Sequence, residues 1–251
     1  MSARKRSRVS ARQATPEVQA KIDSVYNRDG DLTIISSDGM KFVVQSLYLK
    51  AVSSVFKDMI AACTAGAAEA AAELTLTDNE LEHSSILRLL LDLAYSKPLD
   101  NFDLIPCKTM LSLIRLAVKL DCATPLRMIS LLVTQPLAPK SSSLNRFYYA
   151  CALDDVEAAY RFLPAAALQR HPGRAPTGAS STDVPLAAES CLDVCAMSEE
   201  WINQLPRKYF LALLRASRWR MITPCAPGIW DTVATEFRAI VRLQNAKVSA
   251  S

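Results

Sequence analysis

The sequence predicts an α+β protein, in which a small β-sheet near the N-terminus is covered by helices and followed by an all-helical region. Two observations support this prediction. Residues 32–35 and 41–44 are rich in β-forming side chains and lie close together in the sequence. After residue 53, apolar residues recur at helical spacing, and only residues 73–77 alternate like a strand.

The two β-rich runs flank the pair Asp38-Gly39. Glycine adopts positive φ without strain and aspartate tolerates it better than most residues, so this pair favours a tight turn between antiparallel strands. The sequence therefore predicts a β-hairpin over residues 31–44. Before it, Pro16 is typical of a helix start and predicts a short helix over residues 16–26.

Helices are predicted next. Ser53 is a candidate N-cap for a helix over residues 54–63. Residues 61–72 are alanine-rich and fit either a loop or a frayed helix end. The run 77–80 resembles a capping box and predicts a helix from there to Tyr95. A helix is also expected over an apolar stripe that is bounded by Pro125 at its C-terminal side. Another helix is expected over residues 126–133. The stripe consists of Met110, Leu113, Ile114, Ala117 and Leu120.

Residues 135–143 have the composition of a linker, with two prolines and three serines. We therefore expect a folded domain over residues 16–134, a linker over 135–143 and a helical region over 144–251. Within that region, Asp154 is expected to end one helix and Asp155 to start the next. Further helices are predicted over residues 186–197, 199–205, 207–219 and 229–243. The large aromatic side chains should pack as one helical lobe. They are Trp201, Tyr209, Phe210, Trp219 and Trp230.

Composition places limits on the class of protein. Of 251 residues, 50% are hydrophobic and 22% are charged, which supports a folded core and excludes a wholly disordered chain. No apolar run is long enough to span a membrane, and the N-terminus opens with charge. The seven cysteines are an odd number without a Cys-x-x-Cys pair, which favours a reducing compartment. We expect an intracellular protein in the nucleus, the cytoplasm or both.

Positive charge is concentrated at the chain ends. Residues 1–12 carry five basic and no acidic side chains, residues 13–200 carry a net charge of −7, and residues 201–251 carry +6. Residues 1–15 are expected to form a disordered basic arm. The run Arg4, Lys5, Arg6 and Arg8 fits a nuclear-import signal, a phosphate clamp or a solubilising tail. No aromatic residue is interleaved to stack on bases, so direct nucleic-acid binding is not expected.

Signatures of catalysis are missing from the sequence. Only six glycines occur and none forms a Gly-x-Gly pair, which excludes the usual dinucleotide and phosphate-binding loops. His83 and His171 are most simply surface residues, and Cys191 and Cys195 are most simply core residues. The acidic residues 154, 155 and 157 lack the further ligands of a calcium loop. We therefore expect no enzyme, no cofactor and no metal site.

The order of the predicted elements resembles that of BTB/POZ domains, in particular those of the BTB-containing proteins numerous in fungi. The resemblance covers about residues 20–134. Its sequence pieces are residues 29–35, residues 38–44, Leu49 with Ser53 and Phe56, residues 74–76, residues 89–95 and residues 116–120.

This resemblance implies a small sheet capped by helices, with Phe42, Leu49 and Phe56 as core anchors. Asp31, Ser53 and Tyr95 complete the motif residues. BTB domains dimerise and dock protein partners such as cullins, corepressors and cytoskeletal proteins. The resemblance thus implies a non-enzymatic scaffold or adaptor that self-associates, in one form as a substrate adaptor for a cullin-type ubiquitin ligase. The alternative is a nuclear transcriptional regulator that recruits a corepressor.

The sequence departs from the family at two places. Where the family usually has histidine followed by a basic residue, this chain has Gln45-Ser46, so the charged pair that Asp31 makes in many members is not formed in the usual way. Residues 61–72 replace the loop with the cullin contact, and Glu69 is a poor match to it. A groove for a partner is expected next to Leu144, Phe147 and Tyr148. The alternative for these three is burial against the chain's own second half.

Overall fold

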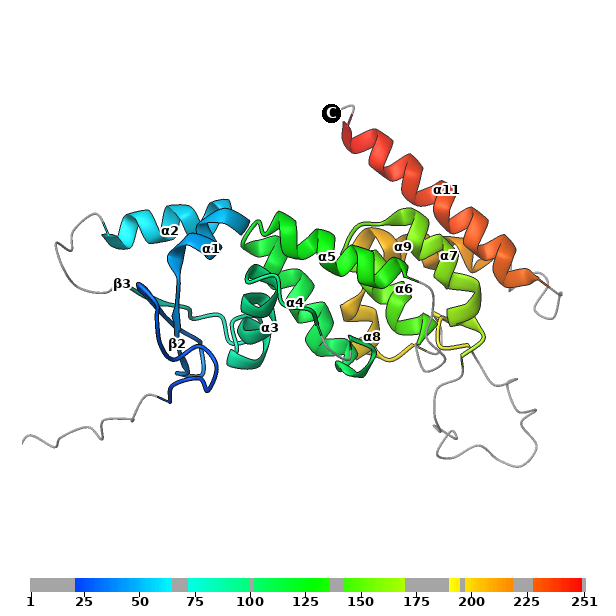
Figure 1. The fold of residues 1–251 in the computed structure, drawn as a ribbon. Helices are drawn as coiled ribbons and strands as arrows, with labels where there is room; N and C mark the ends of the chain where they lie inside the picture. Colours follow the sequence, from blue (N-terminus) through cyan, green and yellow to red (C-terminus); the bar gives the residue numbers. More distant parts are fainter. Residues whose placement is uncertain are drawn as a thin grey trace, which may run out of the picture.

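The computed structural model describes residues 21–64, 72–99, 102–135, 142–169, 190–194, 197–218 and 228–249. The molecule is elongated (Figure 1). A small sheet lies at one end with helices α1 (Ser46–Val52) and α2 (Ser54–Thr64). At the other end lie helices α7 (Val156–Ala167), α9 (Arg207–Ala216) and α11 (Ile229–Ser249). This architecture confirms the predicted α+β class with a helical C-terminal half.

Three strands form the sheet in the order β2-β1-β3. They are β1 (Leu32–Ile35), β2 (Lys41–Val44) and β3 (Ala72–Thr75). β1 and β2 are antiparallel and begin pairing at Ile35 and Lys41, which confirms the predicted hairpin. Gly39 has φ 81°, the left-handed conformation for which the turn needs a glycine. β3 runs parallel to β1.

The outer edge of β2 is covered by residues 21–26. The backbone N–H of Asp23 donates to the Lys41 carbonyl (2.9 Å), and the N–H of Val43 donates to the Tyr26 carbonyl (2.8 Å). The prediction of a helix over residues 16–26 is therefore wrong for its described part. These residues satisfy the backbone groups of a sheet edge that would otherwise be unpaired.

Five helices complete the first half of the described chain. They are α1 (Ser46–Val52), α2 (Ser54–Thr64), α3 (Ser84–Ala94), α4 (Cys107–Lys119) and α5 (Ala123–Thr134), with a short 3₁₀ helix at Phe102–Leu104. Ser53 lies between α1 and α2, and its Oγ accepts a hydrogen bond from the N–H of Phe56 (2.9 Å). The predicted cap is thus confirmed. The predicted apolar stripe of α4 is buried throughout.

Two predicted helix starts are wrong. The helix that ends before Tyr95 begins at Ser84 with His83 as its N-cap. Residues 77–82 instead form a turn, because the Glu82 carboxylate accepts hydrogen bonds from the backbone N–H groups of Thr77 and Asp78. Pro125 does not bound a helix but lies in the first turn of α5. A proline is tolerated there because the first-turn N–H groups have no partner within the helix.

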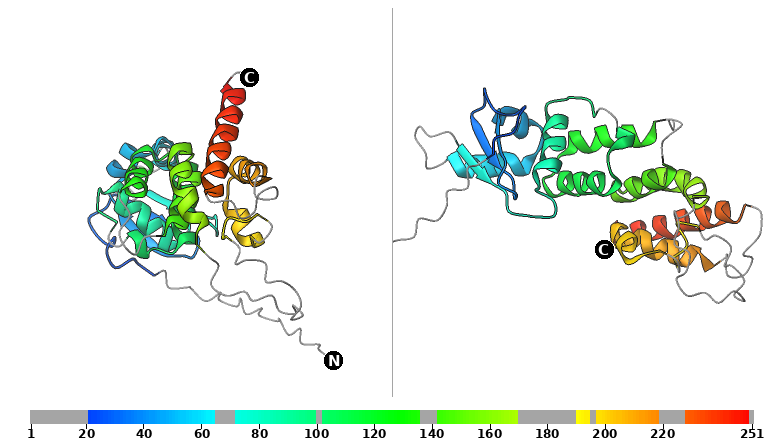
Figure 2. Two further views of the ribbon diagram at one scale, coloured as in Figure 1. Left: turned by 90° about the vertical axis from the view of Figure 1, so that its right-hand side faces the viewer. Right: turned by 90° about the horizontal axis from the view of Figure 1, so that it is seen from below.

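The second half of the chain is helical in its described residues. Its helices are α6 (Ser143–Ala152), α7 (Val156–Ala167), α8 (Glu199–Gln204), α9 (Arg207–Ala216) and α11 (Ile229–Ser249). Asp155 caps α7 by accepting from the N–H of Ala158 (2.9 Å), as expected. Residues 190–194 form turns, so a helix over 186–197 is wrong for this part. α11 lies beside α7 and α9 in both views (Figure 2).

One hydrophobic core runs from the sheet into the C-terminal helices. α6 packs against α4 and α5. Arg146 of α6 is buried and donates to the carbonyls of Val133 (2.8 Å) and Gln135 (2.6 Å), which caps the C-terminal end of α5. Its guanidinium also lies 3.5 Å from the Asp103 carboxylate. The two halves of the chain are therefore joined by a polar contact within a shared core.

Candidate functional site

Four residues of the predicted motif are structural. Phe42, Leu49 and Phe56 have no exposed area, and Ser53 is buried between α1 and α4. The Ser53 hydroxyl donates to the Leu120 carbonyl at the end of α4. These side chains hold the helices against the sheet, and none is accessible to a partner.

Asp31 has a defined partner in Ser46. The backbone N–H of Ser46 donates to Oδ1 of Asp31 (2.6 Å), and its hydroxyl donates to Oδ2 (2.7 Å). The first of these bonds is the main cause of a lowered pKa for Asp31, against the opposing effect of burial, and Lys50 adds a smaller effect in the same direction. The carboxylate thus satisfies the N-terminal end of α1.

Tyr95, at the C-terminal end of α3, also contacts the N-terminal end of α1. Its hydroxyl accepts a hydrogen bond from the N–H of Gln45 (2.7 Å). Its ring lies against Tyr48 with centroids 4.3 Å apart and meets the edge of Tyr26 at 5.3 Å. Burial raises the pKa of Tyr95. The three rings form an aromatic cluster that fixes α1 relative to α3.

The outward side of α1 exposes apolar side chains, and we call Leu47, Tyr48 and Ala51 the α1 face. Leu47 is 72% exposed and Tyr48 is 44% exposed, although both neighbour the fully buried Leu49. Ala51 and Lys50 are exposed as well. Adjacent exposed large apolar residues on one helix are typical of an interaction surface. Neither the motif nor the helical spacing predicted this face, since α1 itself was not expected.

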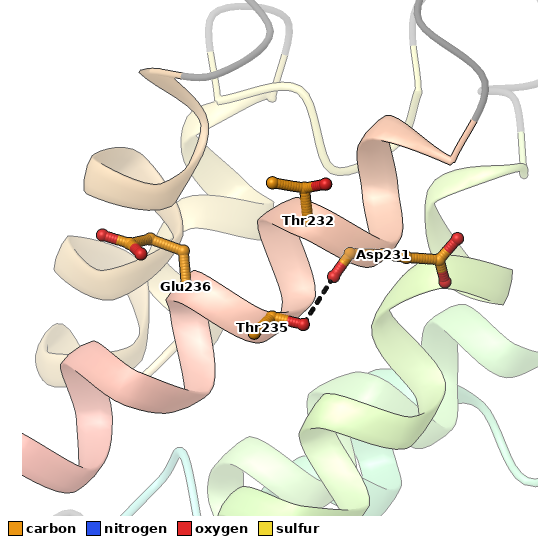
Figure 3. Close-up of a pocket in the computed structure, with 4 residues that line it drawn as sticks. All are labelled: Asp231, Thr232, Thr235 and Glu236. Atoms are coloured by element: carbon orange, nitrogen blue, oxygen red, sulfur yellow. Dashed lines mark hydrogen bonds between the residues drawn. The ribbon is translucent and has the colours of Figure 1, made fainter.

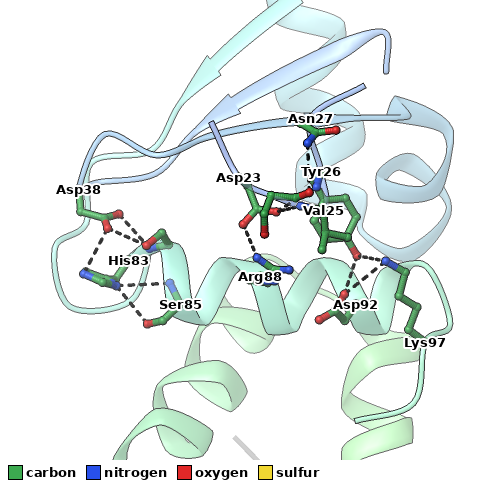
Figure 4. A network of polar contacts seen from close by, with 12 residues as sticks. Asp23, Val25, Tyr26, Asn27, Asp38, His83, Ser85, Arg88, Asp92 and Lys97 are labelled. Carbon is green, nitrogen blue, oxygen red and sulfur yellow. Dashed lines mark hydrogen bonds and ion pairs between the residues drawn. The ribbon is translucent and has the colours of Figure 1, made fainter. Parts of the chain in front are cut away.

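A polar network ties residues 21–27 and the hairpin to α3 (Figure 4). Asp23 forms an ion pair with Arg88, and the Tyr26 hydroxyl donates to Asp92 (2.7 Å). Lys97 lies over the Tyr26 ring at 4.4 Å. These contacts stabilise the fold beside the α1 face.

Asp38, His83 and Ser85 lie in series within the same network. His83 Nε2 is 3.3 Å from Asp38 Oδ2, and its Nδ1 is 3.1 Å from the Ser85 hydroxyl. Many hydrolases use these three residue types. Here, however, Nδ1 of His83 accepts from the backbone N–H of Ser85, so the imidazole works as the N-cap of α3. His83 is half exposed, as the sequence indicated for a surface residue.

Hydrogen bonds at Asp38 complete this cap. Burial raises the pKa of Asp38, but hydrogen bonds from Ser36 and Ser84 outweigh it and lower the pKa to about 2. The Ser84 hydroxyl and N–H reach its two oxygens at 2.6 Å and 2.9 Å. Asp38 therefore joins the hairpin turn to the first turn of α3 and remains charged at neutral pH.

The expected partner groove beside α6 is not open. Phe147 and Tyr148 are buried, the first against Phe237 of α11 (centroids 5.8 Å apart) and the second against Trp201 of α8 (5.0 Å). Leu144 is partly buried and packs against the same core. The chain's own C-terminal helices cover these side chains. The contact removes the apolar face of α6 and the apolar faces of those helices from water together.

A shallow hollow of about 330 Å³ lies on α11 and is lined by Asp231, Thr232, Thr235 and Glu236. The two acidic side chains point to opposite sides of the helix, with the two threonines between them (Figure 3). Sequence reasoning did not find this feature, since the four residues carry no motif.

Several predicted features lie outside the described residues. They are the basic run Arg4, Lys5, Arg6 and Arg8, the arm 1–15, Glu69, His171, Cys195, Trp219 and most of the linker. Within the described ranges, no group of His, Cys, Asp or Glu side chains could hold a metal ion. Nor does any helix there combine the length and hydrophobicity needed to cross a membrane.

Comparison with known proteins agrees with the geometry. Residues 26–135 match the family model of the BTB/POZ domain. These bounds include the sheet, the α1 face and helices α1 to α5. A search of curated proteins gives no match to the chain.

Proposed function

Residues 26–135 of this chain are a BTB/POZ domain, a protein–protein interaction module, and on this premise we propose that the protein is a non-enzymatic scaffold that pairs with a second copy through the α1 face. The α1 face is the observation that carries the proposal. Leu47 and Tyr48 expose a large apolar area that is already rigid, since Leu49 is buried and Tyr48 stacks on Tyr95.

The carboxylate of Asp31 does not oppose such pairing. A carboxylate near an apolar interface costs free energy when a partner desolvates it without compensation. Asp31 is compensated within the chain, because two Ser46 hydrogen bonds occupy its two oxygens. A second copy could therefore cover this region without supplying a basic partner for Asp31.

The experiment is a comparison of molar masses by light scattering after gel filtration. Leu47→Asp places a charge in the α1 face, and Leu104→Asp is the matched control because Leu104 is also 72% exposed but lies in the 3₁₀ helix. We expect the parent and the Leu104 variant to elute as dimers and the Leu47 variant as a monomer. Equal masses for all three would refute the role of the α1 face.

The finer proposal is that this scaffold is a substrate adaptor for a cullin-type ubiquitin ligase. The BTB/POZ domain supports this proposal, and the helical half that packs on α4 and α5 would be the platform for the substrate. Affinity purification of the tagged full chain from its own cells tests it. A cullin recovered in near-stoichiometric amount is the expected result, and recovery of other partners without a cullin would contradict it.

The second candidate function is nuclear transcriptional regulation through corepressor recruitment. The basic run Arg4, Lys5, Arg6 and Arg8, which no acidic residue interrupts, favours this alternative. Deletion of residues 2–12 should then move the fluorescently tagged protein from the nucleus to the cytoplasm. Nuclear exclusion both before and after the deletion would contradict this alternative.

A further inference from the structure

The solvent side of α9 combines positive charge with apolar side chains. The buried side of this helix consists of Tyr209, Ala212, Leu213 and Ala216. Side chains on the opposite side follow the i, i+4, i+7 and i+8 spacing of a single helix face. We call this side the α9 face, and it consists of Arg207, Leu211, Leu214 and Arg215. Both arginines are exposed, and Leu214 is 44% exposed.

The positive charge of the α9 face is not compensated within the described chain. Residues 207–218 carry four basic and no acidic side chains. Of these four, Lys208 and Arg218 pair with acidic side chains of other elements. Among the described residues, Arg207 and Arg215 take part in no ion pair. The unpaired positive charges therefore lie on the α9 face itself, one towards each end of the helix.

Arg207 occupies a position that local helix energetics disfavour. It is the first residue of α9, and no acidic side chain lies in the first turn. The N-terminal end of a helix carries partial positive charge, so a cation there lowers helix stability and an anion raises it. Departures from a local rule are typical of functional positions. A carboxylate from outside the chain would supply the compensation that is missing at this end of α9.

We propose that the α9 face binds an acidic amphipathic helix of a partner protein. Arg207 and Arg215 are eight residues apart, which corresponds to about 12 Å along a helix axis. Two carboxylates about two turns apart on the partner helix would therefore reach both guanidinium groups. Apolar side chains between those carboxylates would cover Leu211 and Leu214. Arginine binds a carboxylate through paired N–H donors and is enriched at protein interfaces.

Two features favour a different protein over other negatively charged ligands. Leu211 and Leu214 need an apolar partner surface, whereas a nucleic-acid backbone offers phosphates. A second copy of this chain does not supply the complementary pattern, because no two acidic residues lie seven or eight positions apart in any helix of the described ranges. The proposal is therefore independent of pairing through the α1 face.

The test measures the binding of fluorescent peptides to the full-length chain by anisotropy. The acidic probe is an alanine-based helical peptide with two glutamates two turns apart and two leucines between them. A reversed probe has lysine in place of each glutamate. The α9 variant carries Arg207→Glu and Arg215→Glu. The matched control carries Arg127→Glu and Arg161→Glu, which make the same change in net charge at exposed arginines of α5 and α7.

We expect the α9 variant to bind the acidic probe about tenfold more weakly than the parent, because two charge pairs are replaced by repulsion. The matched control should bind this probe like the parent. The reversed probe should bind the α9 variant more tightly than it binds the parent, which also shows that the variant is folded. Leu214→Ala should weaken binding of the acidic probe about fivefold, because an apolar contact is lost.

Several outcomes would overturn the proposal. They are a parent that does not bind the acidic probe, an equal loss in the α9 variant and the matched control, and a Leu214→Ala variant that binds like the parent. Vesicles of phosphatidylserine and phosphatidylcholine are compared in the same way. Binding to these vesicles that the α9 variant loses, without binding of the acidic probe, would assign the face to a membrane surface instead. Pairing through α1 is read separately from the molar mass, so its failure leaves this test intact.

Discussion

Ser46 donates two hydrogen bonds to the two carboxylate oxygens of Asp31, one from its backbone N–H and one from its hydroxyl. The N-cap position of α1, Gln45, supplies no side-chain cap of its own. A residue fifteen positions earlier in the chain therefore caps this helix. The α1 face owes its position to a contact that no local sequence rule describes.

Replacement of Asp31 by asparagine should lower the free energy of unfolding by about 1 kcal/mol, because α1 loses a charged cap. Ser46→Ala removes only the hydroxyl bond and should cost less. Urea denaturation measures both values. Asp29→Asn changes a neighbouring exposed aspartate and is the control, which should differ from the parent by a few tenths of a kcal/mol. Equal effects at positions 29 and 31 would contradict the capping role.

The stability that Asp38 contributes should depend on pH in a defined direction. Its pKa in the folded chain is about 2, below the ordinary value of 3.8, so the folded state binds its proton more weakly than the unfolded state does. The contribution is complete above about pH 4 and is lost as the pH falls toward 2. The difference in unfolding free energy between the parent and Asp38→Asn should shrink over this range. Urea titrations at several pH values measure it, and a constant difference would refute the assignment.

Substitution of Arg146 should lower the stability of the fold more than substitution of most other polar residues. Arg146→Met removes the donor to carbonyl groups at the end of α5 and the ion pair with Asp103, so we expect the free energy of unfolding to fall by about 3 kcal/mol. Arg146→Lys keeps the positive charge but loses the forked geometry of the guanidinium. Its free energy of unfolding should lie between those of the parent and Arg146→Met. Thermal and urea unfolding provide the values, with Arg161→Met on the exposed side of α7 as control. A loss below about 1 kcal/mol for Arg146→Met would contradict a joining role.

Two glycines should respond differently to alanine. A Cβ at Gly30 would lie 2.4 Å from the Val44 backbone nitrogen, so strand β2 would have to move. A Cβ at Gly39 meets no atom within 4 Å, and only its φ of 81° opposes a side chain. We expect a cost of about 1 kcal/mol at Gly39 and at least twice that at Gly30. Circular dichroism during urea unfolding compares them, and a larger loss at Gly39 would contradict the packing described.

Local signals predicted much of the fold. The hairpin follows from Asp38-Gly39 between two β-rich runs, and the α4 stripe from apolar residues at helical spacing. The turn after α6 follows from the capping residue Asp155. In each case the residues that decide the structure are near neighbours in sequence, so their pattern is visible without tertiary contacts.

Long-range contacts decided the rest. α1 shows no apolar stripe, since residues 47, 48, 49, 51 and 52 are all apolar, and its cap comes from Asp31. A capping-box pattern at residues 77–80 was misleading, because the Glu82 side chain bonds back to that segment and closes a turn. From the sequence alone, Arg146 resembles a surface residue. Its burial depends on the end of α5, which lies beside it only in the folded chain. The candidate surface on α1 became visible only with exposure values.

The central claim is that this chain associates with itself, and sedimentation of the unmodified full-length protein over a range of concentrations tests it most directly. Pairing through the α1 face predicts a dimer of the chain across this concentration range. A mass equal to the single chain of 27.5 kDa at every concentration would contradict the role of the α1 face.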